Sequence, residues 1–176
     1  MKVLIAIDQS EASHHAIEWV LSNVWEANCR FKLLTVMKPL HNLRHAGIEI
    51  LQTDPHSRER LELRSNLFNF LEGNAARLRE VFSSYCVESS LVEGDAAKNI
   101  VGVAAFWHAD LIVMGRRKMG LLSRLAAESV SREVEKTAPC RLRIISAEDV
   151  KTLQIRQALA AYERISKRDI REGVSP

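Results

Sequence analysis

Five short apolar runs, each followed by a longer stretch, decide the fold class of this chain. The runs cover residues 2–7, 31–37, 86–94, 110–115 and 140–146. The first and fourth are continuous and rich in branched residues, which is typical of strands buried on both faces. Strands that alternate with helices form a parallel sheet with helices on both of its faces. We therefore predict an open, doubly wound α/β fold with a five-stranded parallel sheet.

The stretches between the runs predict the helices. Apolar residues recur at helical spacing over residues 10–28, 57–84, 95–107 and 129–137. Ser10 and Asp95 stand at the start of two of these stretches and are candidate N-caps. Residues 38–56 contain two prolines and a glycine without a clear period, which indicates a long connection.

The C-terminal segment, residues 147–176, predicts an extra helix that ends near Asp169 in a frayed tail. Its apolar stripe consists of Ile155, Ala158, Leu159, Tyr162 and Ile165. Two interpretations are open: the helix packs on its own domain, as amphipathic helices commonly do, or it reaches a partner subunit. We divide the chain accordingly into a domain of residues 1–146 and a helical extension of residues 147–176.

Composition excludes several classes of function. A net charge of +3 is too small to indicate a nucleic-acid partner. No apolar run approaches the ~18 residues of a membrane span, and the chain begins directly with a strand pattern. The three cysteines lie far apart and suit a reducing compartment, so we expect a cytoplasmic protein. The six histidines show no spacing that converges on a metal.

The stretch "VMGRRKMGLLSRLAAESVS", residues 113–131, has the layout of a phosphate-binding turn. It leaves the fourth apolar run at Gly115, passes through three bases and enters a predicted helix at Ser129. Glycines let backbone N–H groups approach a phosphate, and a helix N-terminus favours anions.

Three stretches together resemble the universal stress protein family. They are "KVLIAIDQSEASHHAIEWV", "VEGDAAKNIVGVAAFWHADLIVMGRR" and "ESVSREVEKTAPCRLRII", which follow one another in the family's order over residues 1–146. The resemblance implies a sheet of order 3-2-1-4-5 and a homodimer through the last strand, here Arg141 to Ile145. Arg141 and Arg143 alternate with apolar residues in this strand, which weakly favours an exposed edge that pairs with a second copy.

The resemblance also implies a site for ATP or AMP, with Mg²⁺. The implied base and ribose contacts are Ile7, Asp8, Val36 and Met114, and the implied phosphate contacts are Gly115, Arg117, Lys118, Ser129, Val130 and Ser131. Asp8 has an alternative role, because an acid at the end of a strand can cap the helix that follows.

Two positions depart from the family's nucleotide-binding loop, which is glycine, two residues, glycine, nine residues, then glycine and serine or threonine. Lys118 and Glu128 replace the second and third glycines. Lys118 adds a cation that could contact phosphate. Glu128 places a carboxylate at the expected helix N-terminus, where repulsion between two unit charges at ~4 Å costs about 1–4 kcal/mol. Either Glu128 pairs with neighbouring bases and fills the phosphate site, or it is a solvated loop acid.

Three functions remain open. The first is a regulatory, stress-response dimer with a degraded loop and weak or no ATP binding. The second is an ATP or AMP sensor with a variant Arg/Lys-rich loop. The third is slow nucleotide hydrolysis, for which the sequence offers no identifiable base or metal ligand. We therefore expect a binding protein rather than an enzyme.

Overall fold

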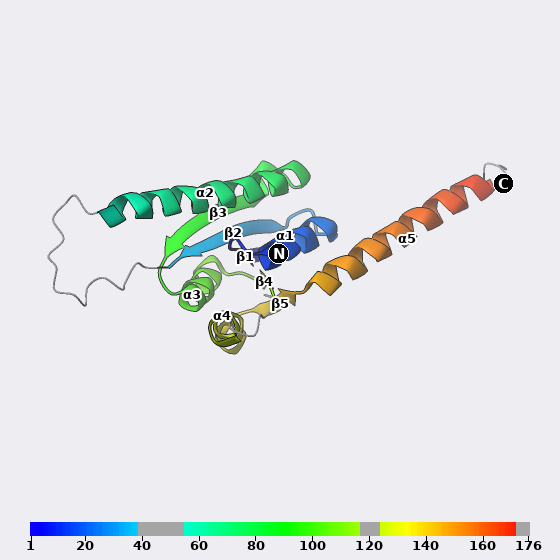
Figure 1. Ribbon diagram of the computed structural model, residues 1–176. Helices are drawn as coiled ribbons and strands as arrows, with labels where there is room; N and C mark the ends of the chain where they lie inside the picture. The colour runs from blue at the N-terminus through cyan, green and yellow to red at the C-terminus, as the bar shows by residue number, and fades with distance from the viewer. Residues whose placement is uncertain (39–54, 117–123, 172–176) are drawn as a thin grey trace.

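The computed structural model describes residues 1–38, 55–116 and 124–171, with side chains except at 55–57, 124–129 and 163–171. Strands and helices alternate along the chain (Figure 1). The elements are β1 (Lys2–Ala6), α1 (Glu11–Ser22), β2 (Arg30–Met37), α2 (Pro55–Val81), the 3₁₀ turn η2 (Ser84–Cys86), β3 (Val87–Glu93), α3 (Ala96–Trp107), β4 (Leu111–Gly115), α4 (Arg124–Thr137), β5 (Arg141–Ile145) and α5 (Ala147–Arg171).

The five strands form one parallel sheet in the order β3-β2-β1-β4-β5, which confirms the predicted fold class and strand order. The chain moves from β1 to β2 on one side, and β4 then pairs with β1 on the other side. This reversal of strand order lies at β1. Ligands of such sheets bind beyond the carboxyl ends of the strands at the reversal, which here are Ala6, Met37 and Gly115.

Two hydrophobic clusters, one on each face of the sheet, form the core. Alternate residues of β1 point to opposite faces, so Val3 and Ile5 pack under α1 and α2, while Leu4 and Ala6 pack under α3 and α4. Both faces of the sheet are therefore covered, as the continuous apolar runs predicted. Among the described residues, no helix combines the length and the apolar character that crossing a membrane requires.

Helix α1 is shorter than predicted, because it ends at Ser22 and not near Asn28. Asn23 adopts an extended backbone with φ −89° and ψ 155°, and its side chain donates to the Trp19 carbonyl at 2.6 Å. The Trp25 indole donates to the Val20 carbonyl at 2.8 Å. The chain thus satisfies the last carbonyls of the helix with side chains instead of a further turn.

Helix α4 begins at Arg124, five residues before the predicted start at Ser129. Ser129 therefore lies in the second turn of the helix and does not open it. The first four N–H groups of a helix are the ones without an intrahelical acceptor, and in α4 these belong to residues 124–127. The expectation that Glu128 and Ser129 occupy the helix N-terminus is wrong.

Helix α5 continues to Arg171 and contacts α1. Val150 is buried, whereas Ile155, Leu159 and Tyr162 are 60%, 58% and 71% exposed. The described residues Ile155, Leu159 and Tyr162 of the predicted stripe therefore do not pack on the domain, and the interpretation that the helix reaches a partner subunit stays a prediction. Figure 1 shows α5 projecting away from the sheet.

Candidate functional site

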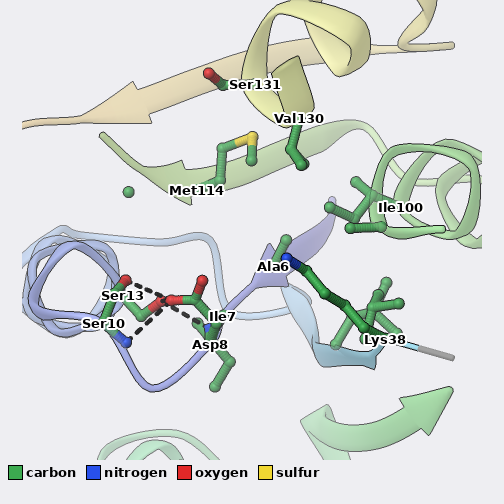
Figure 2. A pocket seen from close by; sticks show the side chains of 14 residues that line it. Ala6, Ile7, Asp8, Ser10, Ser13, Lys38, Ile100, Met114, Val130 and Ser131 are labelled. Carbon is green, nitrogen blue, oxygen red and sulfur yellow. Dashed lines mark hydrogen bonds between the residues drawn. The ribbon is translucent and has the colours of Figure 1, made fainter. Parts of the chain in front are cut away.

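A cavity of about 230 Å³ opens at the carboxyl ends of β1, β2 and β4, where the strand order reverses. Figure 2 shows side chains from both helical layers around it. Its lining consists of Ala6, Ile7, Asp8, Ser10, Ser13, Leu34, Val36, Lys38, Ala96, Ile100, Met114, Gly115, Val130 and Ser131. The position agrees with the general location of ligands in doubly wound sheets.

The polar end of the cavity is organised around Asp8, which follows β1. One carboxylate oxygen, Oδ1, accepts hydrogen bonds from the Ser10 backbone N–H at 3.0 Å and from the Ser13 hydroxyl at 2.9 Å. The Ser10 hydroxyl donates to the same oxygen. The Asp8 backbone N–H in turn donates to the Ser13 hydroxyl at 2.7 Å. Figure 2 shows these bonds as dashed lines, and they hold the carboxylate in one orientation at the cavity wall.

Asp8 therefore combines the two roles that the sequence left open. It binds the segment that begins α1, as a cap would, and it lines the cavity, as a ligand contact would. Ser10 occupies the N-cap position of α1, but its side chain makes no cap hydrogen bond to that helix and turns to Asp8 instead. Ser10 thus takes the predicted N-cap position without the predicted side-chain bond, and its hydroxyl is oriented by donation to the charged Asp8 carboxylate.

The apolar wall of the cavity comes from residues on or beside five elements. Ile7 and Val36 follow or end the first two strands, Met114 lies on β4, and Ile100 and Val130 face them from α3 and α4 (Figure 2). Ile7, Ile100 and Met114 are buried, with exposures of 4%, 4% and 8%. Such a wall suits a flat, apolar group, and the single carboxylate fixes where a hydrogen-bond donor would lie.

Gly115 closes the cavity next to α1 for a steric reason. A Cβ at this position would lie 1.9 Å from the carbonyl oxygen of Ala12 and 2.3 Å from its carbonyl carbon. The described glycine with a positive φ is Gly94 and not Gly115. Gly115 is thus required by the close approach of α1 to β4, and no left-handed backbone is needed there.

The structure brings seven of the predicted contacts to one cavity: Ile7, Asp8, Val36, Met114, Gly115, Val130 and Ser131. Arg117 and Lys118 lie outside the described residues, as do the side chains of Glu128 and Ser129. The hypothesis that Glu128 pairs with neighbouring bases falls on these residues and stays a prediction.

Sequence reasoning missed Lys38, which follows β2 and points across the cavity toward Ala6 (Figure 2). It also missed Ser13 and the α3 residues Ala96 and Ile100. Two signals could have found them. Lys38 follows a strand that adjoins the reversal of strand order, and Ser13 stands five residues after Asp8, in the first turn of α1.

Within the part of the chain that the structure describes, no group of three His, Cys, Asp or Glu side chains could hold a metal. Of the described residues that line the cavity, Asp8 is the only acid and none is a histidine. The described lining offers one carboxylate, hydroxyl groups, a lysine and an apolar wall.

Comparison with known proteins extends this description. The model of the family described as "Universal stress protein family" matches residues 1–146. No curated protein matches the chain.

Solved structures with the same fold share low sequence identity with the chain. The hypothetical protein MJ0577 is 22% identical with a TM-score of 0.65, over 82% of this chain and 94% of that one. A universal stress protein family protein from Arabidopsis thaliana, with AMP bound, is 20% identical with a TM-score of 0.56, over 83% and 91%. A universal stress protein in complex with cAMP is 18% identical with a TM-score of 0.57, over 82% and 95%. At these identities the likeness establishes the fold.

Proposed function

Because this chain belongs to the universal stress protein family, we propose that it is a regulatory, stress-response binding protein whose cavity holds the adenosine part of an adenine nucleotide. In this proposal the β- and γ-phosphates add little to the affinity of the protein for ATP. The observation that carries the proposal is the convergence of Asp8, its two serines and the apolar wall on one cavity at the reversal of strand order.

The dimensions and chemistry of the cavity favour a nucleoside. Its volume of about 230 Å³ lies just below the ~300–1,000 Å³ of typical ligand pockets. An adenine ring suits the wall formed by Ile7, Met114 and Ile100, and ribose hydroxyls suit the Asp8 carboxylate as donors. Two solved relatives are described with AMP and with cAMP, which supports an adenine nucleotide as the ligand class.

Weak binding of further phosphates is supported by the position of α4. Because this helix begins at Arg124, the backbone N–H groups of Ser129, Val130 and Ser131 lie where intrahelical carbonyls accept them. Lys118 and Glu128 also stand where nucleotide-binding members of the family have glycines. Lys38 lines the cavity, and Arg117 and Lys118 are further cations that could contact phosphate.

We propose binding without catalysis, in the cytoplasm, as a homodimer through the edge of β5. The strand is at the end of the sheet, and Arg141 and Arg143 are exposed on it. Thiols suit a reducing compartment, and burial raises the pKa of Cys29 and Cys140 above the usual range, so both stay protonated at neutral pH.

Equilibrium binding of adenosine, AMP and ATP, with and without Mg²⁺, tests this function. We expect all three to bind within about tenfold of one another. The variant Val36→Phe should abolish binding, since it fills the cavity from β2. The matched control is Val92→Phe, because Val92 pairs with Val36 in register and does not line the cavity.

The role of the predicted phosphate loop, which contains Lys118 and Glu128, has its own test. Replacing Lys118 and Glu128 together by glycine should raise the affinity for ATP and leave that for adenosine unchanged. A double variant that gains no ATP affinity would contradict the role given to these two residues. Failure of adenosine, AMP and ATP to bind the wild-type protein would instead favour a regulator that works without nucleotide.

A further inference from the structure

Helix α5 has an anchor and a projecting part. Its anchor includes Val150, which is 7% exposed, and Gln157, whose side chain donates to the Ser22 carbonyl at the end of α1. Beyond the anchor the described side chains of Ile155, Leu159 and Tyr162 are more than half exposed. Figure 1 shows this part extending away from every other helix and strand.

The exposed apolar residues lie on a different face from the anchor. At about 100° per residue, Gln157 lies about 20° from Val150 around the helix axis, whereas Ile155 and Tyr162 lie about 120–140° away. The domain therefore occupies one face of α5 and leaves the apolar face uncovered. A helix with an uncovered apolar face gains little of the packing that normally stabilises helices.

The sequence of this helix has a heptad pattern that passes through Ile155 and Tyr162. Successive residues on it are separated by four, three, four, three and four positions, which is the spacing of coiled-coil a and d positions. They are Lys151, Ile155, Ala158, Tyr162, Ile165 and Asp169. The four inner positions are apolar, and the two outer positions carry opposite charges. We call this set the α5 seam.

We propose that the α5 seam binds the same seam of a second copy of this chain in antiparallel orientation. The sequence positions are symmetric about residue 160, so an antiparallel pair places Lys151 opposite Asp169 of the second copy. Ile155 then faces Ile165, and each Ala158 faces Tyr162. Every layer joins an a position to a d position, as antiparallel coiled coils require.

Charge and size both select this orientation. A parallel pair would place Lys151 against Lys151 and Asp169 against Asp169, and like charges that face each other destabilise a helix pair. It would also place two tyrosines in one layer and two alanines in another. The antiparallel pair joins opposite charges at both ends and matches the smallest apolar residue of the seam with the largest.

The α5 seam is a different surface from the β5 edge. Contact between two seams needs no bound nucleotide. It covers fewer than the three to four heptads that sustain a stable isolated coiled coil. We therefore expect an association that reverses on dilution. A single charge reversal should therefore produce a measurable change in the association constant.

Sedimentation equilibrium of the full chain, over a range of concentrations, tests the seam with charge reversals. Lys151→Glu and Asp169→Lys should each weaken association by roughly tenfold, because each replaces two attractive pairs by two repulsive ones. The double variant carrying both changes should regain wild-type association. Residues 151 and 169 are about 27 Å apart along one helix, so this rescue requires contact between two chains.

The comparison variants make the outcome decisive. Tyr162→Glu should abolish the seam association and leave only the dimer through the β5 edge, while Thr152→Glu, on an exposed residue outside the seam, should change nothing. Circular dichroism checks that each variant folds. A wild-type chain that stays monomeric overturns the proposal. A variant Tyr162→Glu with the same dissociation constant and the same largest species as wild type also overturns it, because the association is then that of the β5 edge. A double variant as weak as the two single ones also overturns it, because the antiparallel register predicts rescue.

Discussion

At the scale of single residues, Gly115 couples the cavity to α1. The nearest atoms that a Cβ would meet belong to the Ala12 backbone, at 1.9 and 2.3 Å, so no side-chain rotation can make room. We predict that Gly115→Ala displaces the first turn of α1. Because Ser13 lies in this turn and is hydrogen-bonded to Asp8, the displacement should also shift Asp8. The free energy of unfolding should fall by about 3 kcal/mol, measured by urea denaturation, and nucleotide affinity should fall with it.

Gly102 provides the control for this prediction. It lies within α3, and a Cβ there meets no atom within 4 Å. Gly102→Ala should raise the free energy of unfolding by up to about 1 kcal/mol, because alanine favours helix more than glycine does. Equal effects of the two substitutions would contradict the steric role of Gly115.

Gly115 and Lys38 show what the sequence could and could not predict at this scale. The position of Gly115 after an apolar run predicted its place at the carboxyl edge of the sheet, where it lines the cavity, but the reason given was the approach of a phosphate. The structure shows an approach of the chain's own helix, and such a tertiary contact leaves no local pattern. Lys38 was missed because a lysine after a strand has no period or motif.

At the scale of elements, a capping box fixes the start of α5. The Ser146 backbone N–H and hydroxyl donate to Asp149 Oδ2 at 2.9 and 2.6 Å, and the Asp149 N–H donates back to the Ser146 hydroxyl at 3.3 Å. These bonds, with a smaller contribution from Arg143, lower the pKa of Asp149 below its ordinary value.

The lowered pKa gives the capping box a pH dependence. Because the carboxyl is more acidic in the folded protein, its stabilisation is complete above the unfolded pKa of about 3.9 and is lost as pH falls through the folded value. Asp149→Asn should reduce the free energy of unfolding by about 1 kcal/mol at pH 7. Urea unfolding at successive pH values should show the two proteins converging below about pH 4. Glu148→Gln, an exposed neighbour, should show no such convergence.

The sequence predicted the strands more accurately than the ends of the helices. The run at residues 110–115 became β4, Leu111–Gly115, and that at 31–37 became β2, Arg30–Met37, because a doubly buried strand must be apolar throughout. Helix ends depended on single polar contacts instead. The bonds of Asn23 and Trp25 to carbonyls of α1 end that helix early, and periodicity does not encode them.

At the scale of the whole molecule, the fold separates a cavity at the carboxyl edge of the sheet from a helix that projects beyond it. The apolar stripe predicted this helix but left its packing open, since a stripe is equally apolar toward its own domain or another chain. In the structure, burial divides the described part of this helix in two. Val150 is 7% exposed and Tyr162 is 71% exposed.

Two truncations should separate the anchor of α5 from its seam. A chain that ends at Gln157 keeps Val150 and the bond to Ser22, so its free energy of unfolding should stay within about 1 kcal/mol of wild type while the seam association is lost. A chain that ends at Ser146 also loses the burial of Val150, which should cost a further 2 kcal/mol or so. Sedimentation equilibrium and urea unfolding measure the two effects separately. Adenosine affinity should be unchanged in the chain that ends at Gln157, because none of the described residues that line the cavity lies beyond Ser131. A chain ending at Gln157 that associates as the full chain does would show that copies meet elsewhere, with the β5 edge as the next surface to alter.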